Sequence, residues 1–166
     1  MTNKINYEIV DNFLSEKSFK EIYDAFNCNY FPWYLQNEIN HNEKNSPQSR
    51  YFTHTFFDCS QQRSEWFYLC DELIEKISLK KLLRIKANLY LSTDKIIEHA
   101  KHIDYDVEGT TCLYYVNTNN GHTNLNDEIK VDSIANRFLK FANNTPHNST
   151  TCTDEKVRLN IVINYV

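Results

Sequence analysis

The chain has 166 residues and a formal net charge of −4, and it is rich in aromatic residues, with 10 Phe, 11 Tyr and 2 Trp. This length fits one domain that buries about two-thirds of its unfolded surface. Its only two glycines, Gly109 and Gly121, lie too far apart for either glycine-rich phosphate-binding motif. The scattered basic residues give no electrostatic footprint for duplex nucleic acid.

The compartment is read from the cysteines and from the apolar segments. The five cysteines are odd in number and form no C-x-x-C pair, so we interpret them as free thiols of a reducing compartment. The N-terminus lacks the apolar core of a signal peptide, and no apolar run approaches the roughly 18 residues that a membrane span needs. We therefore expect one cytoplasmic domain over residues 1–166, without membrane association.

The first half of the sequence predicts a strand and two helices. Residues 7–13 are a strand candidate, and Ser15 is placed to cap a helix over residues 16–26. Apolar side chains at offsets of three and four predict a second helix over residues 62–76. The polar stretch of residues 37–50 is interpreted as a loop, either an ordinary exposed loop or a lid over a site.

From Leu82 onward the pattern changes to short strand candidates that are separated by polar turns. Many short strands after a helical half predict an α+β fold, in the form of a β-sandwich or a jelly roll backed by helices. Residues 96–103 stay ambiguous, because their apolar spacing also suits a helix. The strand candidates cover residues 84–91, 110–116, 129–133, 137–142 and 157–165.

Two histidines and one aspartate are candidate metal ligands. Side chains alternate faces in an extended segment, so His102 and Asp104 point the same way while Ile103 points to the opposite face. His147, from a distant segment, would complete a set of two imidazoles and one carboxylate. This set suits an iron centre that keeps half of its coordination positions open.

The C-terminal strand candidate carries polar residues within an apolar run. Arg158 and Asn160 share one face of it. Burying a guanidinium without a partner is costly, so Arg158 needs an anion. That anion is either the carboxylate of a co-substrate, held through two parallel hydrogen bonds, or an acidic side chain in a structural ion pair.

The other histidines offer a rival interpretation. If residues 96–102 were helical, His99 and His102 would share one face and could form a zinc pair with His147. We favour an extended segment, which turns His99 away from His102. We interpret His41 and His54 as core or surface residues. His122, one residue past Gly121, is interpreted as a solvated loop residue, with contact to the substrate as its alternative.

Several short motifs in the second half follow one another in a distinctive order. They include residues 87–90 (ANLY), His102-Ile103-Asp104, residues 111–117 (TCLYYVN), Gly121-x-Thr123, Phe138-x-x-Phe141, Pro146-His147 and Arg158-x-Asn160. In this order they resemble the prolyl-4-hydroxylase-like branch of the iron(II)/2-oxoglutarate dioxygenases, in particular its small phage-type members. The resemblance covers about residues 84–166. It implies a double-stranded β-helix, a distorted jelly roll with N-terminal helices packed on one sheet.

The resemblance also implies a chemistry. It implies that His102, Asp104 and His147 bind Fe(II), and that O₂ and 2-oxoglutarate are consumed with release of succinate and CO₂. The substrate implied is a protein side chain, which would be hydroxylated. Two alternatives stay open, an oxidative demethylase of modified nucleic acid and a non-catalytic jelly-roll binding module. Residues expected to contact 2-oxoglutarate are Arg158, which holds its distal carboxylate, together with Tyr115, Tyr90 and Asn160.

The first half adds one further alternative. Its aromatic residues either rim the substrate entrance or belong to the hydrophobic core, which is the usual place for aromatic side chains at strand spacing. The residues concerned are Trp33, Tyr34, Tyr51 and Phe52.

Overall fold

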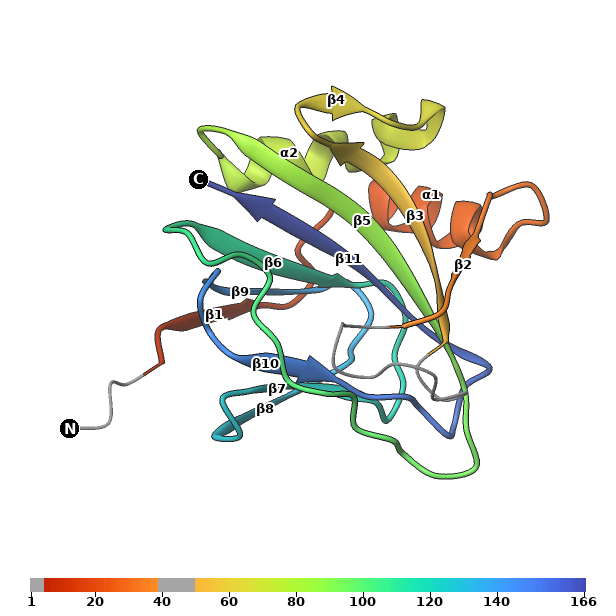
Figure 1. Cartoon of the computed structure of the whole chain (residues 1–166). Coiled ribbons are helices and arrows are strands. Elements are labelled where there is room, and N and C mark those ends of the chain that lie inside the picture. Colours follow the sequence, from red (N-terminus) through yellow and green to blue (C-terminus); the bar gives the residue numbers. More distant parts are fainter. Residues whose placement is uncertain (1–4, 39–49) are drawn as a thin grey trace.

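A computed structural model of the chain describes residues 5–38 and 50–166. Two antiparallel sheets face each other, and the helices cover the outer side of the larger one (Figure 1). The larger sheet has the strand order β1-β9-β6-β11-β5-β3-β2, with β4 paired to β3, and the smaller sheet has the order β10-β7-β8. The predicted jelly roll, backed by N-terminal helices on one sheet, is confirmed.

The elements of the described residues follow one another from a short first strand to a long last one. In chain order they are β1 (Tyr7–Val10), α1 (Glu16–Asn27), β2 (Tyr34–Gln36), β3 (Tyr51–Asp58), β4 (Gln61–Gln62), a 3₁₀ helix (Glu65–Cys70), α2 (Asp71–Ile77), β5 (Leu82–Leu91), β6 (Thr110–Tyr115), β7 (His122–Leu125), β8 (Ile129–Asp132), β9 (Arg137–Ala142), β10 (His147–Ser149) and β11 (Val157–Tyr165).

Local capping explains where the two helical segments begin. The Ser15 hydroxyl accepts a hydrogen bond from the Ser18 N–H at the start of α1. The second segment begins after Ser64, whose hydroxyl accepts from the Trp66 N–H, and its first turns are 3₁₀ before α2 continues. The helix predicted over residues 62–76 therefore starts later than expected and is α-helical only from Asp71.

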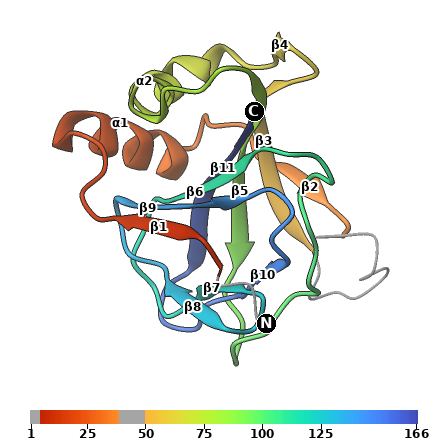
Figure 2. The same cartoon turned by 90° about the vertical axis from the view of Figure 1, so that its left-hand side faces the viewer.

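The large sheet separates two regions of the core, and Figure 2 shows the helices and the smaller sheet on its opposite sides. The first region packs Ile22 and Leu73 of the helices against β11 residues such as Ile161. The second lies between the two sheets and includes Leu113 and Leu125. Burial on both sides explains why the central strands carry long apolar runs.

The ambiguous stretch of residues 96–103 is extended and contains no helix. Two isolated antiparallel bridges fix it beside the strand that includes β10, one pairing Glu98 with Thr150 and the other His102 with His147. The zinc-pair reading required a helix here, so that reading is wrong.

The structure also bears on the predictions made for His122 and for residues 37–50. The prediction of His122 as a solvated loop residue is wrong, because the residue is buried on β7. The predicted loop of residues 37–50 falls mostly on residues 39–49, which lie outside the described residues, as does His41. In the part of the chain that the structure describes, no helix has the length and apolar character needed to cross a membrane.

Candidate metal centre

The predicted ligands converge at one point between the two sheets. One ligand atom from each of His102, Asp104 and His147 lies within 4.8 Å of the other two. The backbones of the two histidines are joined by a pair of hydrogen bonds, each 2.9 Å long, from the N–H of one residue to the carbonyl of the other. These two hydrogen bonds hold His102 and His147, which are 45 positions apart in the sequence, side by side. The centroids of their imidazole rings are 4.5 Å apart.

Each histidine presents one defined nitrogen to this point. The Nδ1 of His102 lies 3.4 Å from the carbonyl of Ala100, and the Nδ1 of His147 lies 3.0 Å from the carbonyl of Thr145. A carbonyl only accepts hydrogen bonds, so each Nδ1 carries the proton and each Nε2 keeps a lone pair for a metal. Burial, together with the nearby His147, lowers the pKa of His102 to about 4, which keeps its ring neutral and able to ligate near pH 7.

Asp104 is held as an anion by its neighbours. Asn164 donates to its Oδ2 over 2.9 Å, and an Arg84 guanidinium nitrogen lies 3.3 Å from its Oδ1. Burial alone would raise the pKa of Asp104, but the nearby His147 and Arg84 and the Asn164 hydrogen bond outweigh it and lower the pKa. An ionised carboxylate beside two imidazole rings is the ligand set that suits an iron centre with open positions.

Arg158 is fully buried and has no counter-charge among the described residues. Its Nε donates to the Ser133 hydroxyl over 2.8 Å, its Nη2 donates to the Thr123 hydroxyl over 3.0 Å, and its Nη1 has no hydrogen-bond partner. No carboxylate of the described residues forms an ion pair with it, so the structural ion-pair reading finds no support there. The guanidinium instead lies over two aromatic rings. Its Cζ is 5.5 Å from the ring centroid of Tyr90 and 5.8 Å from that of Tyr115.

Thr123 is a candidate functional residue that sequence reasoning did not assign. Its Oγ1 accepts from Arg158 and also, over 2.9 Å, from the Tyr115 hydroxyl. With two donors on its oxygen, the Thr123 hydroxyl is free to donate its own proton. The Gly121-x-Thr123 motif was the available signal. A side chain at Gly121 would meet Arg158 Cδ at 2.7 Å, so glycine lets the arginine pack here.

One cavity joins the metal ligands to two of the four residues expected to bind 2-oxoglutarate, Tyr90 and Asn160. Tyr90, Asn160 and Thr123 line it together with the three ligands. Arg158 and Tyr115 lie directly behind Thr123. Asn160 accepts a 2.9 Å hydrogen bond from Asn88, which also lines the cavity.

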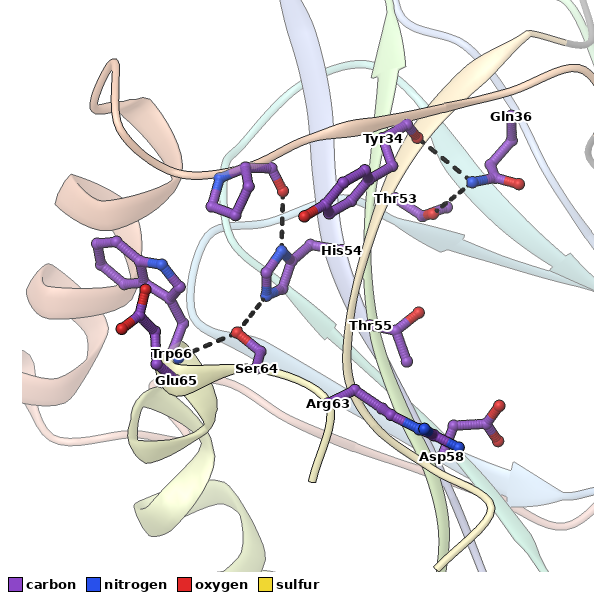
Figure 3. Close-up of a pocket in the computed structure, with 11 residues that line it drawn as sticks. Tyr34, Gln36, Thr53, His54, Thr55, Asp58, Arg63, Ser64, Glu65 and Trp66 are labelled. Carbon is purple, nitrogen blue, oxygen red and sulfur yellow. Dashed lines mark hydrogen bonds between the residues drawn. The ribbon is translucent and has the colours of Figure 1, made fainter. Parts of the chain in front are cut away.

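His99 and His54 lie apart from this centre. His99 is buried, with its Nδ1 2.8 Å from the Ser149 hydroxyl and its ring stacked on Tyr90. Both ring nitrogens of His54 are in use, at 2.8 Å from the Pro32 carbonyl and 2.7 Å from the Ser64 hydroxyl (Figure 3). His54 therefore ties β3 to two flanking segments.

His54 lines a pocket of about 610 Å³ beside β3. Figure 3 shows the side chains around this pocket. None of the three candidate metal ligands lines it. Its lining is a mixture of polar, charged and aromatic residues: Pro32, Tyr34, Gln36, Thr53, His54, Thr55, Asp58, Arg63, Ser64, Glu65 and Trp66.

Comparison with known proteins places the fold. No protein-family model matches the chain, and no curated protein sequence matches it. Among solved structures, a Trichoplax adhaerens prolyl hydroxylase in complex with a hypoxia-inducible factor peptide fragment matches with TM-score 0.71 and 18% identity, over 98% of this chain and 84% of that one. A Pseudomonas putida prolyl-4-hydroxylase matches with TM-score 0.62 and 11% identity, over 98% and 93%.

A third similar structure is the non-heme α-ketoglutarate-dependent epimerase SnoN of nogalamycin biosynthesis. It matches with TM-score 0.70 and 12% identity, over 98% of this chain and 79% of that one. The chain therefore has the fold of the 2-oxoglutarate/Fe(II) oxygenases, in its prolyl-4-hydroxylase-like form. The fold predicted from the motifs is confirmed.

Proposed function

We propose that this chain is an Fe(II)- and 2-oxoglutarate-dependent dioxygenase that hydroxylates its substrate, as a single domain over residues 1–166. One observation carries the proposal: His102, Asp104 and His147 converge near a buried arginine that pairs with no carboxylate of residues 5–38 and 50–166. Neither feature alone specifies the reaction. Together they supply a metal site and a carboxylate site in one enclosed place.

The three ligands fit Fe(II) by their chemistry. Two imidazole nitrogens and one carboxylate occupy half of an octahedral set and leave three positions open. When bound, the iron would activate O₂ and couple decarboxylation of 2-oxoglutarate, to succinate and CO₂, to oxidation of the substrate. The carbonyls of Ala100 and Thr145 would fix both imidazole rings, and Asn164 would fix the carboxylate.

Arg158 would hold the distal carboxylate of 2-oxoglutarate. Its Nη1 has no partner, and the Thr123 hydroxyl has a proton to donate, so two donors are available to the two oxygens of one carboxylate. An incoming anion would also neutralise the guanidinium, which no acidic group of the described residues does. Tyr115 would act through Thr123, because its hydroxyl is committed to that residue.

The aromatic wall of the cavity would exclude water from the reacting groups. Tyr51, Tyr90 and His99 form a continuous stack with ring centroids 5.3 Å apart at both steps. Tyr90 and Tyr51 are buried and line the cavity directly, so the stack would keep water from that side of the reacting groups.

For the substrate we propose a protein side chain. The similar Trichoplax adhaerens prolyl hydroxylase is in complex with a peptide fragment, which supports this choice. We also propose a cytoplasmic location, because all five cysteines are free thiols.

Anaerobic titration with Fe(II) and 2-oxoglutarate, followed by exposure to O₂, tests the proposal. We expect one iron per chain, a visible charge-transfer band when 2-oxoglutarate is added, and succinate release after O₂. His102→Ala should remove the band and the succinate. A wild-type protein that binds iron and 2-oxoglutarate but releases no succinate would instead be a binding module, and one that binds neither would refute the proposed function.

A further inference from the structure

Two cations, Arg84 and Lys86, line the cavity, while Arg158 lies behind Thr123. Alternate residues of β5 face the cavity, and three of the four have partners that account for them. Arg84 pairs with Asp104, Asn88 donates to an amide oxygen, and Tyr90 lies in the aromatic stack. Lys86, the fourth, has one hydrogen bond, a 3.3 Å contact with the hydroxyl of Tyr51.

Lys86 has no acidic partner, since no carboxylate of the described residues forms an ion pair with it. The nearest acid of the site, Asp104, is engaged by Arg84 and Asn164. Burial, reinforced by the charge of Arg84, lowers the pKa of Lys86 to about 8, so the side chain still carries its proton near pH 7. The half-buried ammonium therefore has two N–H donors to spare.

Tyr51 makes this position suitable for an anion. Burial raises the pKa of its hydroxyl, so the group stays neutral and does not compensate the lysine. Its ring is fixed by stacking on Tyr90, at 5.3 Å and an interplanar angle of 9°. The hydroxyl and the ammonium thus form a preorganised pair on the cavity wall with a net positive charge.

Lys86 does not serve the same carboxylate as Arg158. In the pairing of β11 with β5, Arg158 lies opposite Tyr90 and Val162 lies opposite Lys86. Four residues of strand separate the two levels, a distance on the order of 13 Å between backbones. The side chains between the two cations are the amides of Asn88 and Asn160.

We propose that Lys86 and the Tyr51 hydroxyl form a second anion position in the cavity, beside the metal ligands, that takes a carboxylate. The proposal rests on the proposed function, because it assigns a ligand group to the same site. Two sources of the carboxylate share this chemistry. One is the metal-chelating end of 2-oxoglutarate, and the other is an acidic group of the primary substrate.

The first arm of the test uses protein loaded with Mn(II), which does not turn over, and measures dissociation constants by calorimetry. The probes are 2-oxoglutarate and 2-oxobutyrate, which has the chelating end but lacks the distal carboxylate. If the co-substrate is the source, Lys86→Met weakens both probes at least about tenfold, as expected for loss of a charge-assisted hydrogen bond. Lys86→Arg should retain most of the affinity, and Lys17→Met on the exposed face of α1 should change neither.

The second arm titrates acetate into the protein already saturated with Mn(II) and 2-oxoglutarate. If the substrate is the source, Lys86→Met leaves both oxo acids unaffected but abolishes saturable acetate binding that the wild type shows. If Lys86→Met alters neither oxo-acid nor acetate binding, the second anion position is refuted. A wild type that fails to bind Mn(II) or 2-oxoglutarate would point to failure of the proposed function instead.

A metal-free measurement separates a ligand position from a structural role. Because Lys86 is a half-buried charge that no carboxylate of the described residues pairs with, Lys86→Met should leave the unfolding temperature of the metal-free protein unchanged or raise it. A structural lysine would show the reverse, a lowered unfolding temperature, and that result would also overturn the proposal.

Discussion

The two faces of β11 show how one strand divides its work between stability and chemistry. Leu159, Ile161 and Ile163 point to the helix-covered side and pack against α1 and α2. Arg158, Asn160 and Asn164 alternate with them and point between the sheets, where they contact the candidate metal centre or its surroundings. The side that faces the helices is apolar, and its side chains pack against one another without any ligand. The other side contains buried polar atoms, such as Nη1 of Arg158, that have no partner in the part of the chain that the structure describes, and so points to a ligand.

The largest expected effect on activity comes from a change between the two sheets, on the side of the metal ligands. His147→Ala removes one of three metal bonds while leaving the backbone pairing with His102 possible. We expect Fe(II)-dependent succinate formation to disappear and the unfolding temperature of the metal-free protein to change little. Metal content and succinate assays check this result, and normal turnover by the variant would remove His147 from the ligand set.

A change on the helix-covered side of the sheet should lower stability and leave metal binding intact. Leu73→Ala empties a fully buried position of α2 that contacts the sheet core. We expect the free energy of unfolding to fall by about 2–5 kcal/mol, because a cavity is left in a packed core. Iron stoichiometry per folded chain should stay at the wild-type value. Denaturant unfolding and metal analysis give both quantities, and a selective loss of iron without loss of stability would contradict the division of the two faces.

Arg158→Gln sharpens the comparison within the ligand side. It should weaken 2-oxoglutarate binding by tenfold or more, about 1.5–3 kcal/mol, because a charge-assisted contact is lost. Metal affinity should stay close to wild type, since Arg158 is not among the grouped ligands. Arg137→Gln is the matched control, because it removes an arginine that pairs with Asp11 at the surface. Unchanged co-substrate affinity in Arg158→Gln would show that its assigned role is wrong.

Thr123→Val should have a smaller effect of the same kind. The substitution keeps the shape of the side chain but removes the hydroxyl that accepts from Arg158 and Tyr115. We expect 2-oxoglutarate affinity to fall by roughly three- to tenfold, about 1 kcal/mol, as for one hydrogen bond. Calorimetry on the Mn(II)-loaded protein measures the change. A loss as large as that of Arg158→Gln would mean that Thr123, rather than the arginine, dominates binding.

The long, largely apolar strands could be predicted from the sequence, and the short polar strands near the candidate metal centre could not. The bounds of β9 and β11 were predicted as observed, because alternation and apolar runs extend over six residues or more. The strands β7 and β10 were missed, since His122–Leu125 and His147–Ser149 are short and mostly polar. Their pairing with each other is a tertiary event that no local pattern records.

The candidate site shows a similar limit. His102, Asp104 and Arg158 could be found from spacing and from the family resemblance. Thr123 and Lys86 could not, because their importance depends on which groups the strand registers bring near them. A threonine with two donors on its oxygen and a lysine without an acid look ordinary in a sequence. Only their contacts in the folded chain distinguish Thr123 and Lys86 from surface residues.

The smallest expected effect lies at the edge of the helix layer, where Glu72 of α2 accepts from the N–H and the hydroxyl of Ser15, the residue that caps α1. Hydrogen bonds from Ser18 and Ser15 lower the pKa of Glu72 to about 2, from 4.5. A lowered pKa in the folded state means that the contribution to stability is complete above about pH 4.5 and is lost as the pH falls toward 2.

Glu72→Gln should therefore reduce the free energy of unfolding at pH 6 by at most about 1 kcal/mol, since the group is near the surface and partly screened. The difference between variant and wild type should shrink as the pH approaches 2, and Glu75→Gln on the same helix is the matched control for removal of an acidic side chain from α2. Urea unfolding across this pH range measures both. Because Glu72 lies on the helix side of the sheet, 2-oxoglutarate affinity should not change in either variant. A change in that affinity would show that the two faces are coupled through the helix layer.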